Sequence, residues 1–221
     1  MMKNRNVTLF LKESLGPTTA IILACLLAVV LPLTTRSQSL PAAPNLIPGQ
    51  SATALSDGRL LLLGGESASG GINSASIWHP STNTTTDLAS KLIHGRAWHS
   101  ATMLPDGLVL ILGGVGDNRQ NVSTAEVFDP ANQTFSALKS TGITARSRHT
   151  ATLLSDGHVL IAGGVGADGQ TLQSAELWDA AAPSSLNIKS EITARRSHSA
   201  TLLGDGRVLL WGGTNAAGSV L

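Results

Sequence analysis

Four stretches of the sequence follow one pattern: QSATALSDGRLLLLGG (50–65), HSATMLPDGLVLILGG (99–114), HTATLLSDGHVLIAGG (149–164) and HSATLLGDGRVLLWGG (198–213). Their last glycines are separated by 49, 50 and 49 residues. A second motif keeps the same spacing, as SASIWHP (74–80), TAEVFDP (124–130) and SAELWDA (174–180). Two independent motifs with a common period indicate an internal structural repeat of about 50 residues.

Each repeat can be divided into four antiparallel strands. The SATLL-like segment predicts the first strand, and the Asp-Gly after it is the strongest short-range signal for a hairpin turn. The apolar run before Gly-Gly lacks alternation, which is typical of a strand covered on both faces. The second motif predicts a third strand that ends in a turn at Asp-Pro, and a weaker fourth strand follows, such as QTFSAL (133–138).

At these motifs the chain resembles the kelch repeat family, and it is also similar to the central domain of galactose oxidase. The resemblance implies an all-β fold, a kelch-type β-propeller of four-stranded blades, with repeats at 47–95, 96–145, 146–194 and a partial one at 195–221. About three and a half blades are present, and a propeller needs at least four to close. We therefore expect a fragment of a longer protein or a truncated gene product. The family's third-strand tyrosine is replaced by Trp78, Phe128 or Trp178, and Phe135 is the nearest candidate for its fourth-strand tryptophan.

The N-terminus, residues 1–39, is typical of an export signal. Basic residues precede an apolar run from Ala20 to Leu31, and small polar residues follow it. The alternative is a retained membrane anchor formed by residues 16–33. Residues 40–46 form a Pro-rich linker. We expect an extracytoplasmic protein that is secreted, periplasmic or held at the cell surface, and that contacts a membrane only through this segment if it stays uncleaved.

Composition limits the chemistry that these residues can supply. The net charge of +1 does not favour nucleic acid as a partner. Cys25 is the only cysteine, and there is no tyrosine, so the copper–tyrosine–cysteine chemistry of galactose oxidase-like enzymes and the tyrosine nucleophile of sialidases are both missing. We expect a non-catalytic binding module without a cofactor, whose ligand is a protein or a glycan. The alternatives are a fragment of a carbohydrate-active isomerase or oxidase with its catalytic residues in missing blades, and a structural spacer of a surface protein.

Residues that recur in every repeat are expected to support the fold. The recurring arginine and the recurring glutamate are replaced together in the first repeat, by Ile47 and Ser76, which predicts an Arg–Glu pair within a unit; sequence drift is the alternative. The recurring histidines are expected to hydrogen-bond a neighbouring loop and not to bind a metal, because no carboxylate recurs beside them. The recurring set is Arg96, Arg146, Arg195, Glu126, Glu176, His99, His149, His198, Gly64, Gly65, Gly113, Gly114, Gly163, Gly164, Gly212 and Gly213.

Residues that vary between repeats on a shared surface are the better candidates for binding. The position before the histidine holds Gly49, Trp98, Arg148 and Ser197. Antiparallel strands put the loop before the first strand and the loop after Gly-Gly at the same end of a sheet. We call the resulting surface the loop face; an ordinary solvated loop is the alternative for each of its residues. Its predicted members are Glu66, Trp98, Asp117, Arg119, Arg148, Asp168, Arg196 and Asn215.

Overall fold

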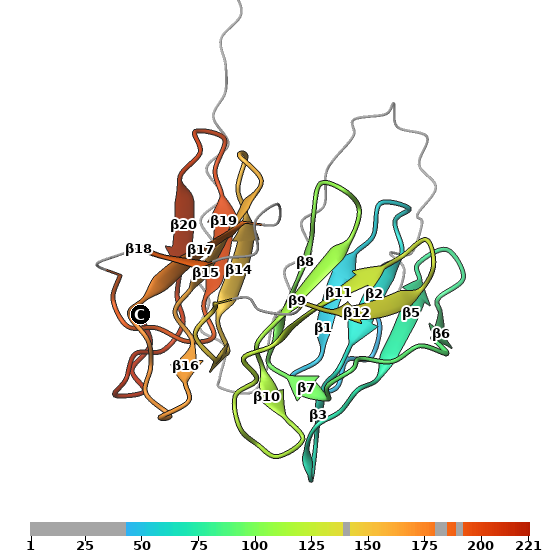
Figure 1. Ribbon diagram of the computed structural model, residues 1–221, viewed down its shortest axis with the longest axis horizontal. Coiled ribbons are helices and arrows are strands. Elements are labelled where there is room, and N and C mark those ends of the chain that lie inside the picture. The colour runs from blue at the N-terminus through green and yellow to red at the C-terminus, as the bar shows by residue number, and fades with distance from the viewer. Residues whose placement is uncertain (1–42, 139–141, 180–184, 189–191) are drawn as a thin grey trace, which may run out of the picture. The chain divides into compact units, whose positions relative to one another are not determined.

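The computed structural model describes residues 43–138, 142–179, 185–188 and 192–221, and these residues are all-β (Figure 1). The chain divides into two units, Met1–Ser39 and Leu40–Leu221, and every described residue belongs to the second unit. The regular elements of the described residues are strands, which confirms the all-β part of the predicted fold class. No helix in the described ranges is long and apolar enough to cross a membrane. The predicted export signal and the start of the linker lie outside the described residues.

Each of the first three repeats forms one antiparallel sheet of four strands. The first sheet consists of β1 (Ser51–Ala54), β2 (Leu60–Leu63), β5 (Ala75–His79) and β6 (Thr84–Asp87). The second consists of β8 (Ser100–Met103), β9 (Val109–Leu112), β11 (Ala125–Asp129) and β12 (Thr134–Ala137). The third consists of β14 (Thr150–Leu153), β15 (His158–Ala162), β17 (Ala175–Asp179) and β18 (Ser185–Ile188). The fourth repeat contributes a hairpin of β19 (Ser199–Leu202) and β20 (Val208–Trp211).

The Asp-Gly turns form the hairpins that the sequence predicts. In the second repeat, the amide of Gly107 donates to the carbonyl oxygen of Leu104 at 3.0 Å. The Asp106 carboxylate accepts the amide of Leu108 at 3.0 Å. Gly107 has a φ of 85°, a conformation that glycine adopts without steric cost. The turn therefore fixes the register of β8 against β9.

The hydrophobic cores lie between consecutive sheets. Leu61 and Leu63 of β2 belong to one buried cluster with Val109 and Ile111 of β9. The alternate residues of β9, such as Leu110, belong to the next cluster, which includes residues of β15. The second strand of a repeat thus packs on both sides, which explains why its sequence is apolar without alternation.

The aromatic residue of the third strand is buried in each repeat. Trp78 is 6% exposed, Phe128 is 0% exposed and Trp178 is 2% exposed. Phe135 of the fourth strand is half-buried and lies with its ring centroid 4.8 Å from that of Phe128. The third strand of each of the first three repeats therefore places an aromatic ring in the core.

Three small two-stranded sheets were not predicted from the sequence. The residues after Gly-Gly pair with another short segment, and two of these pairings involve the residues just before the first strand of the same repeat. The pairs are β3 (Glu66–Ser67) with β4 (Gly70–Gly71), β7 (Arg96–Ala97) with β10 (Val115–Gly116), and β13 (Arg146–Ser147) with β16 (Val165–Gly166). The labelled strands β3, β7, β10 and β16 lie at the lower end of the larger sheets in Figure 1. Both loops of the predicted loop face are thereby brought together.

Candidate ligand-binding face

Arg96 and Arg146 lie two residues before the variable position of the loop face and form buried ion pairs. The joint loss of the recurring arginine and glutamate from the first repeat predicts such pairs. The Nη2 atom of Arg96 lies 2.6 Å from Oε1 of Glu126, and both side chains are fully buried. Arg146 forms the equivalent pair with Glu176. Each pair lies within one repeat, between the residues before the first strand and the third strand.

Backbone groups complete the surroundings of these charges. The Nη1 atom of Arg96 donates to the carbonyl oxygen of Gly113 at 2.9 Å. The Glu126 carboxylate accepts the amides of Ile93 at 2.8 Å and His94 at 3.0 Å. Burial lowers the pKa of the Arg96 guanidinium, and the Glu126 carboxylate opposes this shift. A buried ion pair is destabilising unless its remaining donors and acceptors are satisfied. The carbonyls and amides here supply most of those partners, and among the described residues Arg96 Nε is left without one.

The repeated histidines connect consecutive repeats. His99 Nε2 lies 2.8 Å from the Ser51 hydroxyl, and His149 Nε2 lies 2.9 Å from the Ser100 hydroxyl. His198 makes the same contact with Thr150 at 3.0 Å. The predicted partner, a neighbouring loop, is wrong: each hydroxyl belongs to the first strand of the preceding repeat. These strands β1, β8, β14 and β19 lie side by side in sequence order.

The histidines are held in the neutral form. Burial, with a nearby arginine, lowers the pKa of His99 and His149 to about 3 and that of His198 to about 4. Each histidine therefore acts as an uncharged hydrogen-bonding group between two repeats. Within the described ranges, no three side chains of His, Cys, Asp or Glu gather in a way that could hold a metal ion.

The Gly-Gly pair allows the next repeat to approach closely. A methyl group on Gly113 would lie 2.3 Å from the carbonyl oxygen of Arg146, and Gly113 has a φ of 59°. The following amide, that of Gly114, donates to the same carbonyl at 2.9 Å. Only glycine satisfies both the close contact and the left-handed backbone.

The variable position before each histidine forms a hydrogen-bonded ladder across the repeats. The Trp98 amide donates to the Gly49 carbonyl at 2.8 Å, and the Arg148 amide donates to the Trp98 carbonyl at 2.9 Å. Ser197 continues the ladder to Arg148 at 2.9 Å. All four residues have a positive φ, with 57° at Trp98, 56° at Arg148 and 52° at Ser197. The ladder brings side chains from different repeats together, as the sequence predicts.

Trp98, Arg148 and Glu66 form a contact chain on the loop face. The Arg148 guanidinium lies 4.1 Å from the centroid of the Trp98 ring. The Trp98 indole nitrogen donates to the Glu66 carboxylate at 2.9 Å. The three residues come from three consecutive repeats, Glu66 from the first, Trp98 from the second and Arg148 from the third, so this contact is not visible from sequence spacing.

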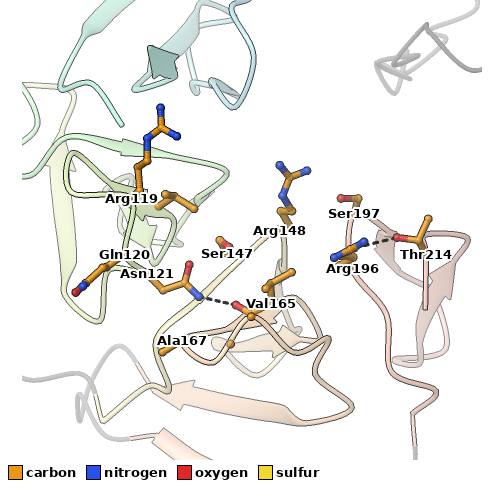
Figure 2. Close-up of a pocket in the computed structure, with 13 residues that line it drawn as sticks. Arg119, Gln120, Asn121, Ser147, Arg148, Val165, Ala167, Arg196, Ser197 and Thr214 are labelled. Atoms are coloured by element: carbon orange, nitrogen blue, oxygen red, sulfur yellow. Dashed lines mark hydrogen bonds between the residues drawn. The ribbon is translucent and has the colours of Figure 1, made fainter. Parts of the chain in front are cut away.

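A pocket of about 690 Å³ lies beside these three residues, and its lining includes three arginines, Arg119, Arg148 and Arg196 (Figure 2). Arg196 Nε donates to the Thr214 hydroxyl at 3.2 Å, and Arg119 Nη2 donates to the carbonyl oxygen of Ala68. Burial lowers the pKa of Arg148; the Glu66 carboxylate opposes this shift and the Arg196 guanidinium adds to it. The pocket is lined by Val115, Arg119, Gln120, Asn121, Ser147, Arg148, Val165, Gly166, Ala167, Gly169, Arg196, Ser197 and Thr214.

Three other predicted members of the loop face, Asp117, Asp168 and Asn215, are not among the residues that line this pocket. Asp117 lines two neighbouring hollows beside His94 and Gly95. The carboxylate of Asp168 accepts the amide of Gln170, and the side chain of Asn215 accepts the amides of Ala217 and Ser219. The last two residues therefore stabilise their own loops.

Several polar residues of the pocket were missed in the sequence. Gln120, Asn121, Ser147 and Thr214 line it, although none carries a charge and only Gln120 recurs, as Gln170. Asn121 Nδ2 donates to the carbonyl oxygen of Val165 at 2.7 Å, across to the following repeat (Figure 2). The available signal was that these residues lie in the same two kinds of loop as the predicted members of the loop face, before the first strand or after Gly-Gly.

The fold and this face define an all-β repeat protein with a cationic pocket between its repeats. Comparison with models of known protein families gives no match, and comparison with curated proteins gives none either.

Proposed function

We propose that the chain is a non-catalytic binding module that recognises a protein or glycan outside the cytoplasm through its loop face. Its four-stranded sheets serve as blades of a kelch-type β-propeller, consistent with the repeat motifs and with first strands that lie side by side. Export is inferred from the sequence of the N-terminal segment, residues 1–39.

One observation carries the proposal: repeated and variable residues have separate roles. The repeated glutamates and histidines and two of the repeated arginines, Arg96 and Arg146, are buried and bonded to other groups of the fold. The variable residues Trp98 and Arg148 are half-buried beside an open pocket. A scaffold that fixes variable side chains around a hollow is the usual arrangement of a binding site.

The backbone of the variable position supports the same conclusion. Tryptophan and arginine are uncommon at a φ near 57°, where a residue with a Cβ carries a steric cost. Such strain clusters at ligand-binding and active sites. Tryptophan and arginine are also the residue types that most often dominate the free energy of binding.

The test is a screen of the purified chain on immobilised glycans and on immobilised peptides, repeated with variants. Trp98→Ala or Arg148→Ala should weaken a genuine ligand by about 2 kcal/mol or more. Pro130→Ala, in the turn at the opposite end of the second sheet, is the control and should leave binding unchanged. Binding that survives both loop-face changes but is lost on changes in the Asp-Gly or Asp-Pro turns would refute the proposed face.

A further inference from the structure

We infer that the pocket binds a small saccharide through a carboxylate group, with Arg148 and Arg196 as its cationic partners. The inference rests on the proposed function and specifies the ligand class of the same face.

The charge of the pocket favours an anion. Its described lining contains three arginines and no aspartate or glutamate. The positive charges come from different repeats, Arg119 from the second, Arg148 from the third and Arg196 from the fourth. A concave, partly desolvated surface strengthens the field of such charges compared with an open surface.

Arg148 has donors available for a ligand. No described residue forms a hydrogen bond or ion pair with its guanidinium, which is held instead by the face of the Trp98 ring at 4.1 Å. The stacking orients the planar donor fork before a ligand arrives, which reduces the ordering cost of binding. Arg196 uses Nε for the Thr214 hydroxyl and keeps its terminal nitrogens as further donors. A carboxylate matches the geometry of such forks.

The rest of the lining matches a sugar better than an acidic peptide. Gln120, Asn121, Ser147, Ser197 and Thr214 offer amide and hydroxyl groups that can pair with sugar hydroxyls. Asn121 donates to Val165, which leaves its side-chain oxygen as an acceptor. The volume of about 690 Å³ falls within the range of small-molecule sites and is bounded on several sides by loops.

The experiment is isothermal titration of the full chain with three acidic oligosaccharides: trigalacturonate, sialyllactose and a hyaluronan tetrasaccharide. The methyl ester of each compound keeps the sugar shape and removes the charge. Hexaglutamate is titrated in parallel as the acidic peptide. At least one acidic oligosaccharide should bind at least about tenfold more tightly than its ester, because charged hydrogen bonds are lost in the ester.

Two matched variants locate the site. Arg148→Asn removes the charge and keeps a residue that tolerates positive φ, so it should weaken the acidic sugar by about tenfold or more. Arg59→Gln removes the same charge from the turn between β1 and β2 and should leave the affinity unchanged. Urea unfolding of both variants checks that each is folded.

Several results would overturn the inference. These are equal affinity for acid and ester, equal weakening by Arg148→Asn and Arg59→Gln, binding of hexaglutamate alone, or binding of none of the three sugars. If a neutral glycan or a peptide from the screen still depends on Arg148, only the carboxylate inference fails. If every ligand is insensitive to the loop-face variants, the proposed function fails with it.

Discussion

The second repeat and the C-terminal hairpin contain nearly the same motif, at 99–114 and 198–213, in very different surroundings. Leu110 and Leu112 of β9 are 0% and 2% exposed, whereas the equivalent Leu209 and Trp211 of β20 are 45% and 73% exposed. A methyl group on Gly113 would collide with Arg146, whereas no described atom lies within 4 Å of the same position on Gly212. The burial of the motif's residues therefore depends on the repeat that follows it.

The physical reason is that each repeat buries its apolar residues against its neighbours. Leu110 and Leu112 belong to the cluster that includes Val159 and Ile161 of the third repeat. In the described residues nothing occupies the equivalent place beside β20, which pairs only with β19. Substitutions at equivalent positions should then lower the free energy of unfolding by very different amounts, and this difference can be measured.

The largest difference is expected at the repeated arginines. Arg146→Met should lower the free energy of unfolding by about 3–5 kcal/mol, because it leaves the buried Glu176 carboxylate without its partner. Arg195→Met should cost only about 1 kcal/mol, because Arg195 donates to the carbonyl oxygens of Gly212 and Thr193 and is half-buried. Urea unfolding followed by tryptophan fluorescence measures both values. An equal loss in the free energy of unfolding for the two variants would contradict the expected difference between these repeats.

A double-mutant cycle on Arg146 and Glu176 tests the pair itself. Coupling of more than about 1 kcal/mol is expected, since an exposed pair gives less than this. Coupling near zero would favour sequence drift as the explanation of Ile47 and Ser76.

A similar but smaller contrast is expected between equivalent leucines. Leu110→Ala should cost about 2–5 kcal/mol, because it leaves a cavity between two sheets. Leu209→Ala should cost less than about 1 kcal/mol, because nearly half of the side chain is already exposed. The same urea titrations apply, and a large cost at Leu209 would indicate that another surface covers β20 in solution.

The histidines give the most specific effect, a pH dependence that grows as the solution becomes more acidic. The pKa of His149 is about 3 in the folded chain and near 6.5 when unfolded, so below pH 6.5 the unfolded state binds a proton that the folded state does not. As the pH is lowered below 6.5, the free energy of unfolding should thus fall by about 1.4 kcal/mol per pH unit for each such histidine. His149→Gln should make the fall shallower between about pH 6.5 and pH 4. An unchanged slope would mean that His149 is already protonated in the fold.

Much of the fold could be predicted from the sequence because the motif encodes its own local interactions. Asp106-Gly107 specifies a turn, and an apolar run without alternation specifies a strand covered on two sides. The Arg146–Glu176 pair was predictable because both charges are missing from the first repeat. The small sheets, such as β7 with β10, were not predictable, because two-residue pairings carry no periodicity.

The candidate site was only partly predictable. The variable position before the histidine identified Trp98 and Arg148, since its neighbours are constant. The stacking of these two residues depends on the ladder of left-handed residues, which sequence spacing does not reveal. Asn121 and Thr214 line the pocket through contacts between repeats, and neither has a repeated counterpart that would mark it.

Two arginines only two residues apart have different roles: Arg146 belongs to the scaffold, and Arg148 lies on the proposed binding face. The most direct test is the free energy of unfolding of Arg148→Asn, measured beside that of Arg146→Met. We predict a change below about 1 kcal/mol for Arg148→Asn, the scale of a half-exposed cation–π contact, against about 3–5 kcal/mol for Arg146→Met. A loss of stability for Arg148→Asn as large as that for Arg146→Met would make Arg148 part of the scaffold and contradict this division of roles.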